Sequence, residues 1–282
     1  MCRHVAYLGP PVTLHSVLID PPYGLYKQAW APRFQRPGAV NADGFGVGWY
    51  PDAAEASDAS VAAAGLGDPG DSEPVRYRQA VPIWADPSFA DLAWVTRTGA
   101  LLAMVRNATP GTSPGPAAVG PFRHGRWLFT HNGYLAGWPE STAGVAATLP
   151  TVALLELEAP VDSALAWALV LHRLRAGHAP AAALAGTIGV LQAAGVTGNF
   201  NFLLTDGRVI AATAAGNTLY YRQAEGSVTV ASEPGGDDPG WIVVPGGSVV
   251  TAVPAQVSVT PLAAPSDLSV PDTTPDGRIT IR

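Results

Sequence analysis

The sequence begins Met1-Cys2-Arg3-His4, and this stretch decides the fold that we expect. Cys2 is the only cysteine in the chain and stands directly behind the initiator methionine. Because aminopeptidases remove a methionine that precedes a small residue, we expect the mature chain to begin with Cys2. Its thiol, with an ordinary pKa of about 8.5, then shares one residue with an α-amine of pKa about 7.7–8.0 that can act as its general base. The alternative is a chance cysteine on a fraying terminus.

The composition predicts a folded chain with a sizeable core. Of its 282 residues, 48% are hydrophobic and 13% are charged, which argues against global disorder. The formal net charge of −6 disfavours nucleic acid or an anionic membrane as the main partner. A single cysteine excludes a disulfide framework, and the histidines show no metal-ligand spacing, so we expect no metal and no other cofactor. Without a secretory signal or a membrane span, we expect a cytoplasmic protein.

The apolar patterns predict two groups of strands separated by two helices. The first strands are expected at residues 5–8, 75–82, 100–105 and 126–130, and the later ones at 202–205, 209–213, 219–222, 228–231 and 248–253. The helices are expected at residues 163–175 and 180–194, with His172 as a core histidine. Residues 16–37 are expected to form an irregular connection. This order favours layered sheets with helices packed outside them.

A glycine-rich block, Asn41-Ala-Asp-Gly-Phe-Gly-Val-Gly-Trp, leads into another expected strand. Its Gly44-x-Gly46-x-Gly48 pattern superficially resembles a phosphate-binding loop. In such a loop the glycines open a helix, and here they precede a strand, so we do not expect a nucleotide site. The glycines instead predict a close approach of backbone or substrate.

Two low-complexity stretches define the expected domain limits. Residues 52–74 are rich in Ala, Asp, Gly and Ser and are expected to be a surface insertion, and residues 263–282 form a polar, proline-rich tail. The remainder is expected to be one catalytic domain over residues 1–262.

Five separated stretches resemble, in order, the class II glutamine amidotransferase domains. They are Met1-Cys2-Arg3-His4, the block from Asn41 to Trp49, Arg106-x-Ala108-Thr109, His131-Asn132-Gly133 and Val161-Asp162-Ser163. The resemblance covers roughly residues 1–260. It implies an N-terminal-nucleophile hydrolase with an α+β fold, a four-layer αββα sandwich. Each motif is weak alone, and their order behind Cys2 makes the signal specific.

The resemblance also implies a role for each motif. Cys2 is the expected nucleophile, and attack on an amide carbonyl creates an oxyanion that needs preorganised donors. The implied donors are the side chain of Asn132 and the backbone N–H of Gly133. The alternative for Asn132-Gly133 is a simple hairpin turn, which this dipeptide often forms.

Three further residues are implied to bind the glutamyl part of a small-molecule substrate. Arg106, at an expected strand end, would clamp the α-carboxylate through its bidentate fork, with a surface ion pair as the alternative. Asp162 would bind the α-ammonium, with a helix N-cap as the alternative. Thr109 is expected to support the substrate carboxylate or the loop.

Additional stretches are similar to the stand-alone hydrolases of ergothioneine biosynthesis, which cleave γ-glutamyl-hercynylcysteine S-oxide. They are Asp20-Pro-Pro with Gly24-Leu, Val161-Asp-Ser-Ala164, Ala231-Ser-Glu-Pro234 and Asp237-Asp238-Pro-Gly-Trp241. This resemblance implies release of glutamate and hercynylcysteine S-oxide through a thioester on Cys2. Two alternatives stay open, a general γ-glutamyl amide hydrolase or glutaminase and an inactive domain that binds γ-glutamyl ligands.

The chain departs from the larger family at two positions. Met104 stands where many members have a histidine two residues before the arginine, and the loop at residues 119–122 lacks an expected histidine. The resemblance gives neither the oligomeric state nor the residues that hold the leaving group. Aromatic side chains beside the motifs are candidates for its permanent cation, with simple packing as the alternative. They are Trp49, Tyr50, Tyr134 and Trp138.

Overall fold

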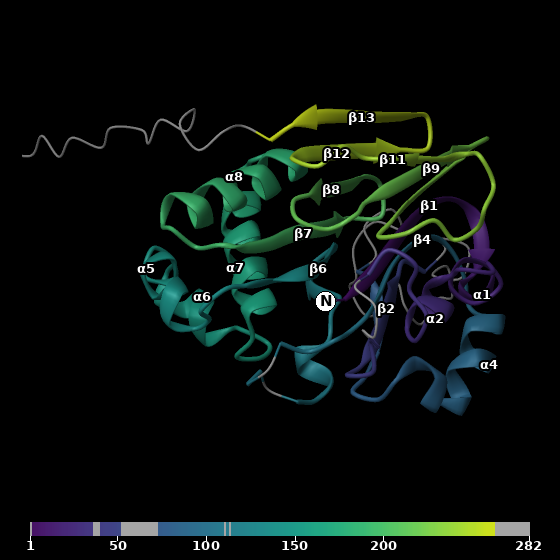
Figure 1. Cartoon of the computed structure of the whole chain (residues 1–282), viewed down its shortest axis with the longest axis horizontal. Coiled ribbons are helices and arrows are strands. Elements are labelled where there is room, and N and C mark those ends of the chain that lie inside the picture. The colour runs from purple at the N-terminus through teal and green to yellow at the C-terminus, as the bar shows by residue number, and fades with distance from the viewer. Residues whose placement is uncertain (1, 36–39, 52–72, 110, 113, 263–282) are drawn as a thin grey trace, which may run out of the picture.

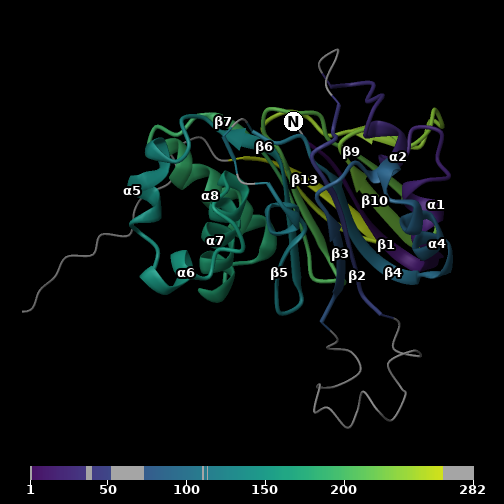
Figure 2. The ribbon, with the colours of Figure 1, turned by 90° about the horizontal axis from the view of Figure 1, so that it is seen from below.

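The computed structural model describes residues 2–35, 40–51, 73–109, 111–112 and 114–262. These residues form an α+β fold of four layers, in which two antiparallel sheets face each other and each is covered by helices (Figure 1; Figure 2). Figure 2 shows the layers side by side, with α5–α8 at one end and α1, α2 and α4 at the other. The predicted αββα sandwich is confirmed.

The first sheet has seven strands in the order β11-β9-β10-β1-β4-β2-β3. Their bounds are β1 Arg3–Thr13, β2 Phe45–Trp49, β3 Val75–Gln79, β4 Arg97–Val105, β9 Tyr220–Ala224, β10 Ser227–Ala231 and β11 Trp241–Val243. The strand that follows Cys2 therefore lies at the centre of the sheet, between β10 and β4. A central strand is fixed by ladders on both edges, which gives the residue at its start a rigid support.

The second sheet has six strands in the order β13-β12-β8-β7-β6-β5. Their bounds are β5 Phe122–His124, β6 Trp127–Leu135, β7 Gly198–Thr205, β8 Ile210–Ala214, β12 Ser248–Val253 and β13 Gln256–Pro261. Strand β6 carries Asn132 and Gly133 opposite Asn201 and Phe200 of β7. Because this pairing continues to Leu135, the Asn-Gly pair lies within a strand, and the hairpin-turn alternative is wrong.

The helices form the two outer layers. Those outside the first sheet are α1 Leu14–Leu18, α2 Leu25–Gln28 and α4 Pro87–Val95; those outside the second are α5 Ala143–Ala146, α6 Thr151–Leu155, α7 Asp162–Arg175 and α8 Pro180–Ala193. Short 3₁₀ turns lie at Ile83–Ala85, Pro116–Ala118 and Glu140–Thr142. Among the described residues, no helix combines the length and the apolarity that a membrane crossing requires.

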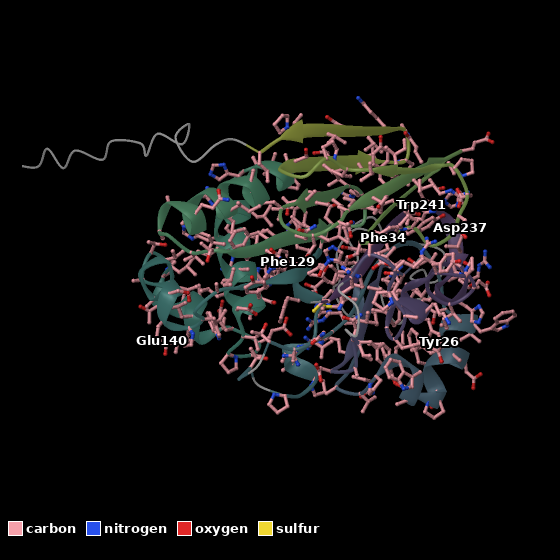
Figure 3. The ribbon with its side chains drawn as sticks, in the orientation of Figure 1. Tyr26, Phe34, Phe129, Glu140, Asp237 and Trp241 are labelled. Atoms are coloured by element: carbon pink, nitrogen blue, oxygen red, sulfur yellow. The ribbon has the colours of Figure 1, made fainter. Side chains whose placement is uncertain are left out.

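Three apolar clusters fill the spaces between the layers. Along β1, Ala6 and Leu8 point into the cluster between the sheets, while Val5 and Tyr7 point toward the helices on the other face. This alternation is the period of two that a strand buried on both faces requires. The third cluster joins α7 and α8 to the second sheet, and in it Phe129 stacks on Trp167 at 5.3 Å between ring centroids. Figure 3 shows Phe129 in the interior, with Glu140 and Asp237 at opposite ends of the molecule.

The glycine block behaves as its pattern predicts. A Cβ at Gly46 would collide with the carbonyl oxygen of Gly120, so the two backbones approach too closely for any side chain. A Cβ at Gly48 would lie 2.7 Å from Leu128 of the facing sheet. The glycines of β2 therefore allow close packing between the two sheets.

Other expectations need correction. Residues 16–37 are not wholly irregular, because α1 and α2 lie within or beside them and bury Leu14, Leu18 and Leu25. His172 is exposed on α7 and is not a core residue. Strands β11 and β13 and helix α4 were not anticipated. Residues 52–72 of the expected insertion, the expected tail at 263–282 and Met1 lie outside the described residues.

Candidate active site

Cys2 lies at the entrance to β1 and is 6% exposed. Its thiol lies 3.8 Å from the carbonyl oxygen of Asn107, in the loop that follows the neighbouring strand β4. Burial raises the pKa of the thiol above its ordinary value, against the lowering influence of nearby positive charge that includes Arg106. The thiol is therefore protonated near neutral pH and needs a base before it can attack.

Two side chains, Arg3 and Asn132, hydrogen-bond to the main chain of Cys2. The guanidinium of Arg3 donates to the Cys2 carbonyl at 3.4 Å and forms a buried ion pair with Glu233, with 2.7 Å between Nε and Oε1. In the amide orientation that satisfies its neighbours, Asn132 donates from Nδ2 to the Cys2 carbonyl at 2.5 Å. Its Oδ1 then accepts from the hydroxyl of Ser232 at 3.2 Å. Cys2 is thus fixed through its backbone, and the residue lines the pocket described below.

The stretch Ala231-Ser-Glu-Pro234 therefore has a physical role that the sequence did not reveal. Ser232 also accepts the N–H of His4 at 3.0 Å, and its own N–H donates to the His4 carbonyl at 2.9 Å. The second oxygen of Glu233 accepts the N–H of Arg33 at 2.7 Å. This stretch ties the start of β1 to β10 and to the segment before β2.

Arg106 follows directly after β4, as predicted, and is 6% exposed. Its Nη2 donates to the hydroxyl of Thr112 at 3.0 Å. The segment is held by the glycine block: the Asp43 N–H donates to the Arg106 carbonyl at 3.0 Å, and the Arg106 N–H donates to the Gly44 carbonyl at 2.7 Å. Because the Arg106 side chain is nearly buried, the alternative of a surface ion pair does not fit it.

Asp162 is the first residue of α7 and is 4% exposed. Val161, not Asp162, occupies the N-cap position of α7, so the alternative of Asp162 as the N-cap residue is wrong. The carboxylate still accepts two backbone N–H groups, from Ser163 at 2.7 Å and from Leu135 at 3.0 Å. A carboxylate is favoured at this end of a helix by the helix dipole. These contacts aim a fixed negative charge at the pocket.

The predicted site residues meet around one small pocket. It is lined by Cys2, Arg106, Asn107, Ala108, Thr109, Thr112, Ala118, Gly133, Val161, Asp162 and Ser163. Five of the six predicted residues line it directly, and Asn132 lies behind Cys2 in contact with its carbonyl. The lining places a thiol, a guanidinium and a carboxylate around one cavity. Such an arrangement can bind a small zwitterion and present one of its carbonyl groups to a nucleophile.

Gly133 meets a strict steric requirement. A Cβ there would collide with the carbonyl oxygen of Asn199 and would lie 2.5 Å from Nε2 of His131. No other residue fits without displacing β7. The glycine thus allows β6 to pass close to β7 where Gly133 lines the pocket, which a larger residue could not do.

The candidate aromatic residues do not form one cluster. Trp49 and Tyr50 lie at the far end of β2, where Trp49 pairs with Leu101, whereas the Cys2 end of the sheet pairs Phe45 with Val105. Tyr50 is a core residue whose hydroxyl donates to the carbonyl groups of Arg126 and Thr205. Simple packing is therefore the correct interpretation for Tyr50.

Metal ligation has no support in the described part of the chain, where no group of three or more His, Cys, Asp or Glu side chains could hold an ion. His4 and His131 are both buried, and they hydrogen-bond to Thr130 and to the carbonyl oxygen of Asn199, respectively.

Comparison with known proteins agrees with this geometry. Residues 28–226 match the family described as class II glutamine amidotransferases. The chain has a TM-score of 0.61 against the structure of a glutamine aminotransferase class-II domain protein from Silicibacter pomeroyi, at 24% identity over 93% of this chain and 100% of that one. It has the same TM-score against glutamine phosphoribosylpyrophosphate amidotransferase from B. subtilis, at 15% identity over 93% of this chain and 49% of that one.

The chain belongs to the class II glutamine amidotransferases, and it is an amidohydrolase of the N-terminal-nucleophile type. Within that class it is similar along nearly its whole length to curated enzymes named gamma-glutamyl-hercynylcysteine sulfoxide hydrolase. The relative from Mycolicibacterium smegmatis is 37% identical over 93% of this chain and 100% of its own length. The relative from Mycobacterium tuberculosis is also 37% identical, over 93% of this chain and 97% of its own length.

Proposed function

We propose that the protein hydrolyses the γ-glutamyl amide of γ-glutamyl-hercynylcysteine S-oxide to glutamate and hercynylcysteine S-oxide, a step of ergothioneine biosynthesis. The observation that carries the proposal is the convergence of Cys2, Arg106 and Asp162 on one small pocket. The similarity to the mycobacterial hydrolases over 93% of the chain supports the substrate.

The reaction begins with transfer of the Cys2 proton. After Met1 is removed, the α-amine of Cys2 takes the thiol proton, and the thiolate attacks the γ-carbonyl carbon. A carbon–sulfur bond forms, the carbon–nitrogen bond breaks, and the ammonium returns the proton to the leaving amine. Water then attacks the glutamyl thioester, so glutamate leaves and the Cys2 thiol is restored.

The oxyanion of each tetrahedral intermediate is stabilised by Asn132 and Gly133. An amide nitrogen carries two N–H groups, and one of those on Asn132 already holds the Cys2 carbonyl. The other is assigned to the oxyanion, together with the Gly133 N–H at the pocket wall. Such donors act best when they are fixed before the reaction. The position of both residues within the paired strands β6 and β7 supports this assignment.

The glutamyl head is held by its two charges. The Arg106 guanidinium takes the α-carboxylate in a bidentate pair, and Asp162 takes the α-ammonium. Thr109, in the same pocket lining, supports the carboxylate side. The described pocket is small, which suits the glutamyl group and leaves the leaving group outside it.

The wider properties follow from the same proposal. Residues 1–262 act as one catalytic domain on a small molecule, and a net charge of −6 disfavours nucleic acid as a second ligand. The cytoplasm, where thiols remain reduced, suits a nucleophile that is the only cysteine of the chain.

The test is a comparison of kcat/KM for γ-glutamyl-hercynylcysteine S-oxide and for free glutamine. We expect the S-oxide to be cleaved far faster. Equal values, or a preference for glutamine, would make the protein a general glutaminase. Binding of both compounds without glutamate release would make it an inactive γ-glutamyl-binding domain.

A further inference from the structure

His131 is a buried histidine beside the pocket that the mechanism above does not use. It precedes Asn132 on β6 and is 1% exposed. Its Nε2 lies 2.7 Å from the carbonyl oxygen of Asn199, and its Nδ1 lies 3.1 Å from Oγ of Ser163. The ring also packs edge-on against Phe202, with 5.0 Å between centroids. The imidazole is therefore fixed on three sides.

The contact with Asn199 sets the tautomer of His131. A carbonyl oxygen only accepts, so Nε2 must carry the hydrogen of this bond. Burial lowers the pKa of His131, although the Asp162 charge and the Asn199 carbonyl oppose this, so the ring is neutral. A neutral ring with a protonated Nε2 has a lone pair on Nδ1. Among the described residues, the Ser163 hydroxyl is the donor hydrogen-bonded to that lone pair.

The Ser163 hydroxyl has one hydrogen and two acceptors within reach. They are Nδ1 of His131 at 3.1 Å and Oδ1 of Asp162 at 3.2 Å. If the hydrogen goes to Asp162, a buried lone pair on His131 is left without a donor, which is unfavourable. Asp162 does not depend on the hydroxyl, because it accepts two backbone N–H groups and faces a pocket that a substrate cation can enter. With the pocket occupied, the hydrogen therefore points to His131.

With its hydrogen directed to His131, the Ser163 oxygen keeps two lone pairs that can accept a hydrogen bond from a donor in the pocket. Ser163 lines the pocket beside Asp162, with only 3.2 Å between Oγ and Oδ1. An ammonium group has three N–H donors and needs more than one acceptor. Two adjacent acceptors, one of them anionic, match that need.

We propose that Ser163 is a substrate-binding residue whose hydroxyl oxygen accepts a hydrogen bond from the glutamyl α-ammonium, and that His131 is the positioning residue that directs this hydroxyl. The proposal rests on the proposed function, since a glutamyl group must occupy this pocket. It adds a neutral acceptor to the charge of Asp162 and explains why a buried histidine stands next to Asn132.

The test compares the binding of L-glutamate and glutarate, which differ only in the α-amine. Calorimetry is done on the full chain, with wild-type protein and the Ser163→Ala variant. Loss of one hydrogen bond to a charged group should raise the Kd for glutamate about tenfold, while the Kd for glutarate stays nearly unchanged. The matched control is Ser141→Ala, whose hydroxyl donates to the Ala136 carbonyl at 2.6 Å away from the pocket lining, and it should change neither Kd.

A second variant isolates the positioning role. His131→Phe keeps a ring against Phe202 but offers no Nδ1, so the Ser163 hydrogen can turn to Asp162. Glutamate binding should weaken as in Ser163→Ala, and the double variant should be no weaker than Ser163→Ala alone. Additive losses in the double variant would overturn the positioning role.

The outcomes separate this inference from the proposed function. If wild type prefers glutamate over glutarate and Ser163→Ala keeps the full preference, the inference fails and the proposed function stands. Equal weakening of both ligands in Ser163→Ala also overturns the inference. If wild-type protein shows no preference for glutamate, the glutamyl site of the proposed function fails as well.

Discussion

The carboxylate of Asp43 accepts a hydrogen bond from the N–H of Ala108 at 2.7 Å, although the two residues are 65 positions apart. Two main-chain bonds between Asp43-Gly44 and Arg106 lie beside this contact. Together they hold the loop that carries Arg106 and that turns the Asn107 carbonyl toward the Cys2 thiol. The glycine block of the sequence therefore contains a clamp, formed by Asp43 and Gly44, on the loop of Arg106 and Ala108.

Removing the Asp43 carboxylate tests this clamp. Asp43→Ala should lower kcat/KM about tenfold or more, since a hydrogen bond to a charged group contributes about 1.5–3 kcal/mol. Asp43→Asn keeps an acceptor oxygen and should retain most of the activity. Because Asp43 is exposed, water replaces part of the lost hydrogen bond, and the Tm should fall by only a few degrees. Steady-state kinetics and thermal melts check both points.

The matched control for Asp43 is Asp86→Ala. The Asp86 carboxylate also accepts a backbone N–H, from Ser88 at 3.1 Å, but it lies at the start of α4. This variant should leave kcat/KM unchanged. Wild-type kcat/KM in Asp43→Ala would show that the loop does not depend on the clamp.

The steric requirement at Gly133 predicts a severe effect from one methyl group. Gly133→Ala places a Cβ against the Asn199 carbonyl, which should separate β6 from β7, destabilise the fold by about 1–3 kcal/mol and abolish measurable turnover. Gly144→Ala is the control, because a Cβ there meets nothing within 4 Å. Urea unfolding and activity are measured for both. A stable, active Gly133→Ala would refute the assignment of its backbone to the pocket wall.

Arg106 should not tolerate lysine, although the charge is kept. Lysine cannot reproduce the bidentate fork on a carboxylate, so Arg106→Lys should lower kcat/KM about 10–100-fold, mainly through KM. Arg97→Lys, at the other end of β4, replaces an exposed side chain that donates to the Pro11 carbonyl and should be neutral. Equal kinetics for the two variants would remove Arg106 from the carboxylate site.

The buried His4 should make the folded state less stable in acid. It is fully buried, and burial, with smaller contributions from the charges of Arg3 and His131, lowers its pKa to about 3. The unfolded chain, with an ordinary histidine pKa of about 6.5, binds more protons than the native chain below that pH. The contribution of His4 is therefore present above about pH 6.5 and is lost as the pH falls toward about 3.

Urea unfolding at two pH values checks this dependence. Between about pH 6.5 and about pH 5, His4 alone should remove up to about 2 kcal/mol, at about 1.4 kcal/mol per unit. His4→Gln, which does not titrate, should show a smaller loss over the same range. Identical losses in both proteins would place the acid sensitivity elsewhere.

The sequence predicts the layers well because alternating apolar strands and long apolar helices are local patterns. Helix α7 was expected within one residue of its observed bounds, whereas β6 was expected at residues 126–130 and continues to Leu135. Helix α1 was missed because five residues are too short for a periodic signal, and its stability comes from burying Leu14 and Leu18 on the sheet. His172 was predicted to be buried because its helix is mostly apolar, yet it is exposed. A mostly apolar helix can still place one residue in solvent.

The site was predicted through its chemical groups, and its supports were not. Cys2, Arg106 and Asp162 were identified because the short motifs around them resemble those of the class II glutamine amidotransferases. The Asp43 clamp and the pair of Arg3 with Glu233 join residues far apart in the chain, and no local pattern reveals such partners. Asp43 and Glu233 stand in sequence motifs to which no catalytic role was assigned. Their presence in those motifs was the available signal for the two contacts.

The central claim is that Cys2, as the first residue of the mature chain, carries the glutamyl group during turnover. The most direct measurement is mass spectrometry of the N-terminal peptide after rapid quenching of the protein with γ-glutamyl-hercynylcysteine S-oxide. We predict a peptide that begins at Cys2 and carries a glutamyl group on sulfur, which is absent when substrate is omitted and cannot form in Cys2→Ala. Glutamate release by a chain that retains Met1, or turnover by Cys2→Ala, would contradict the account.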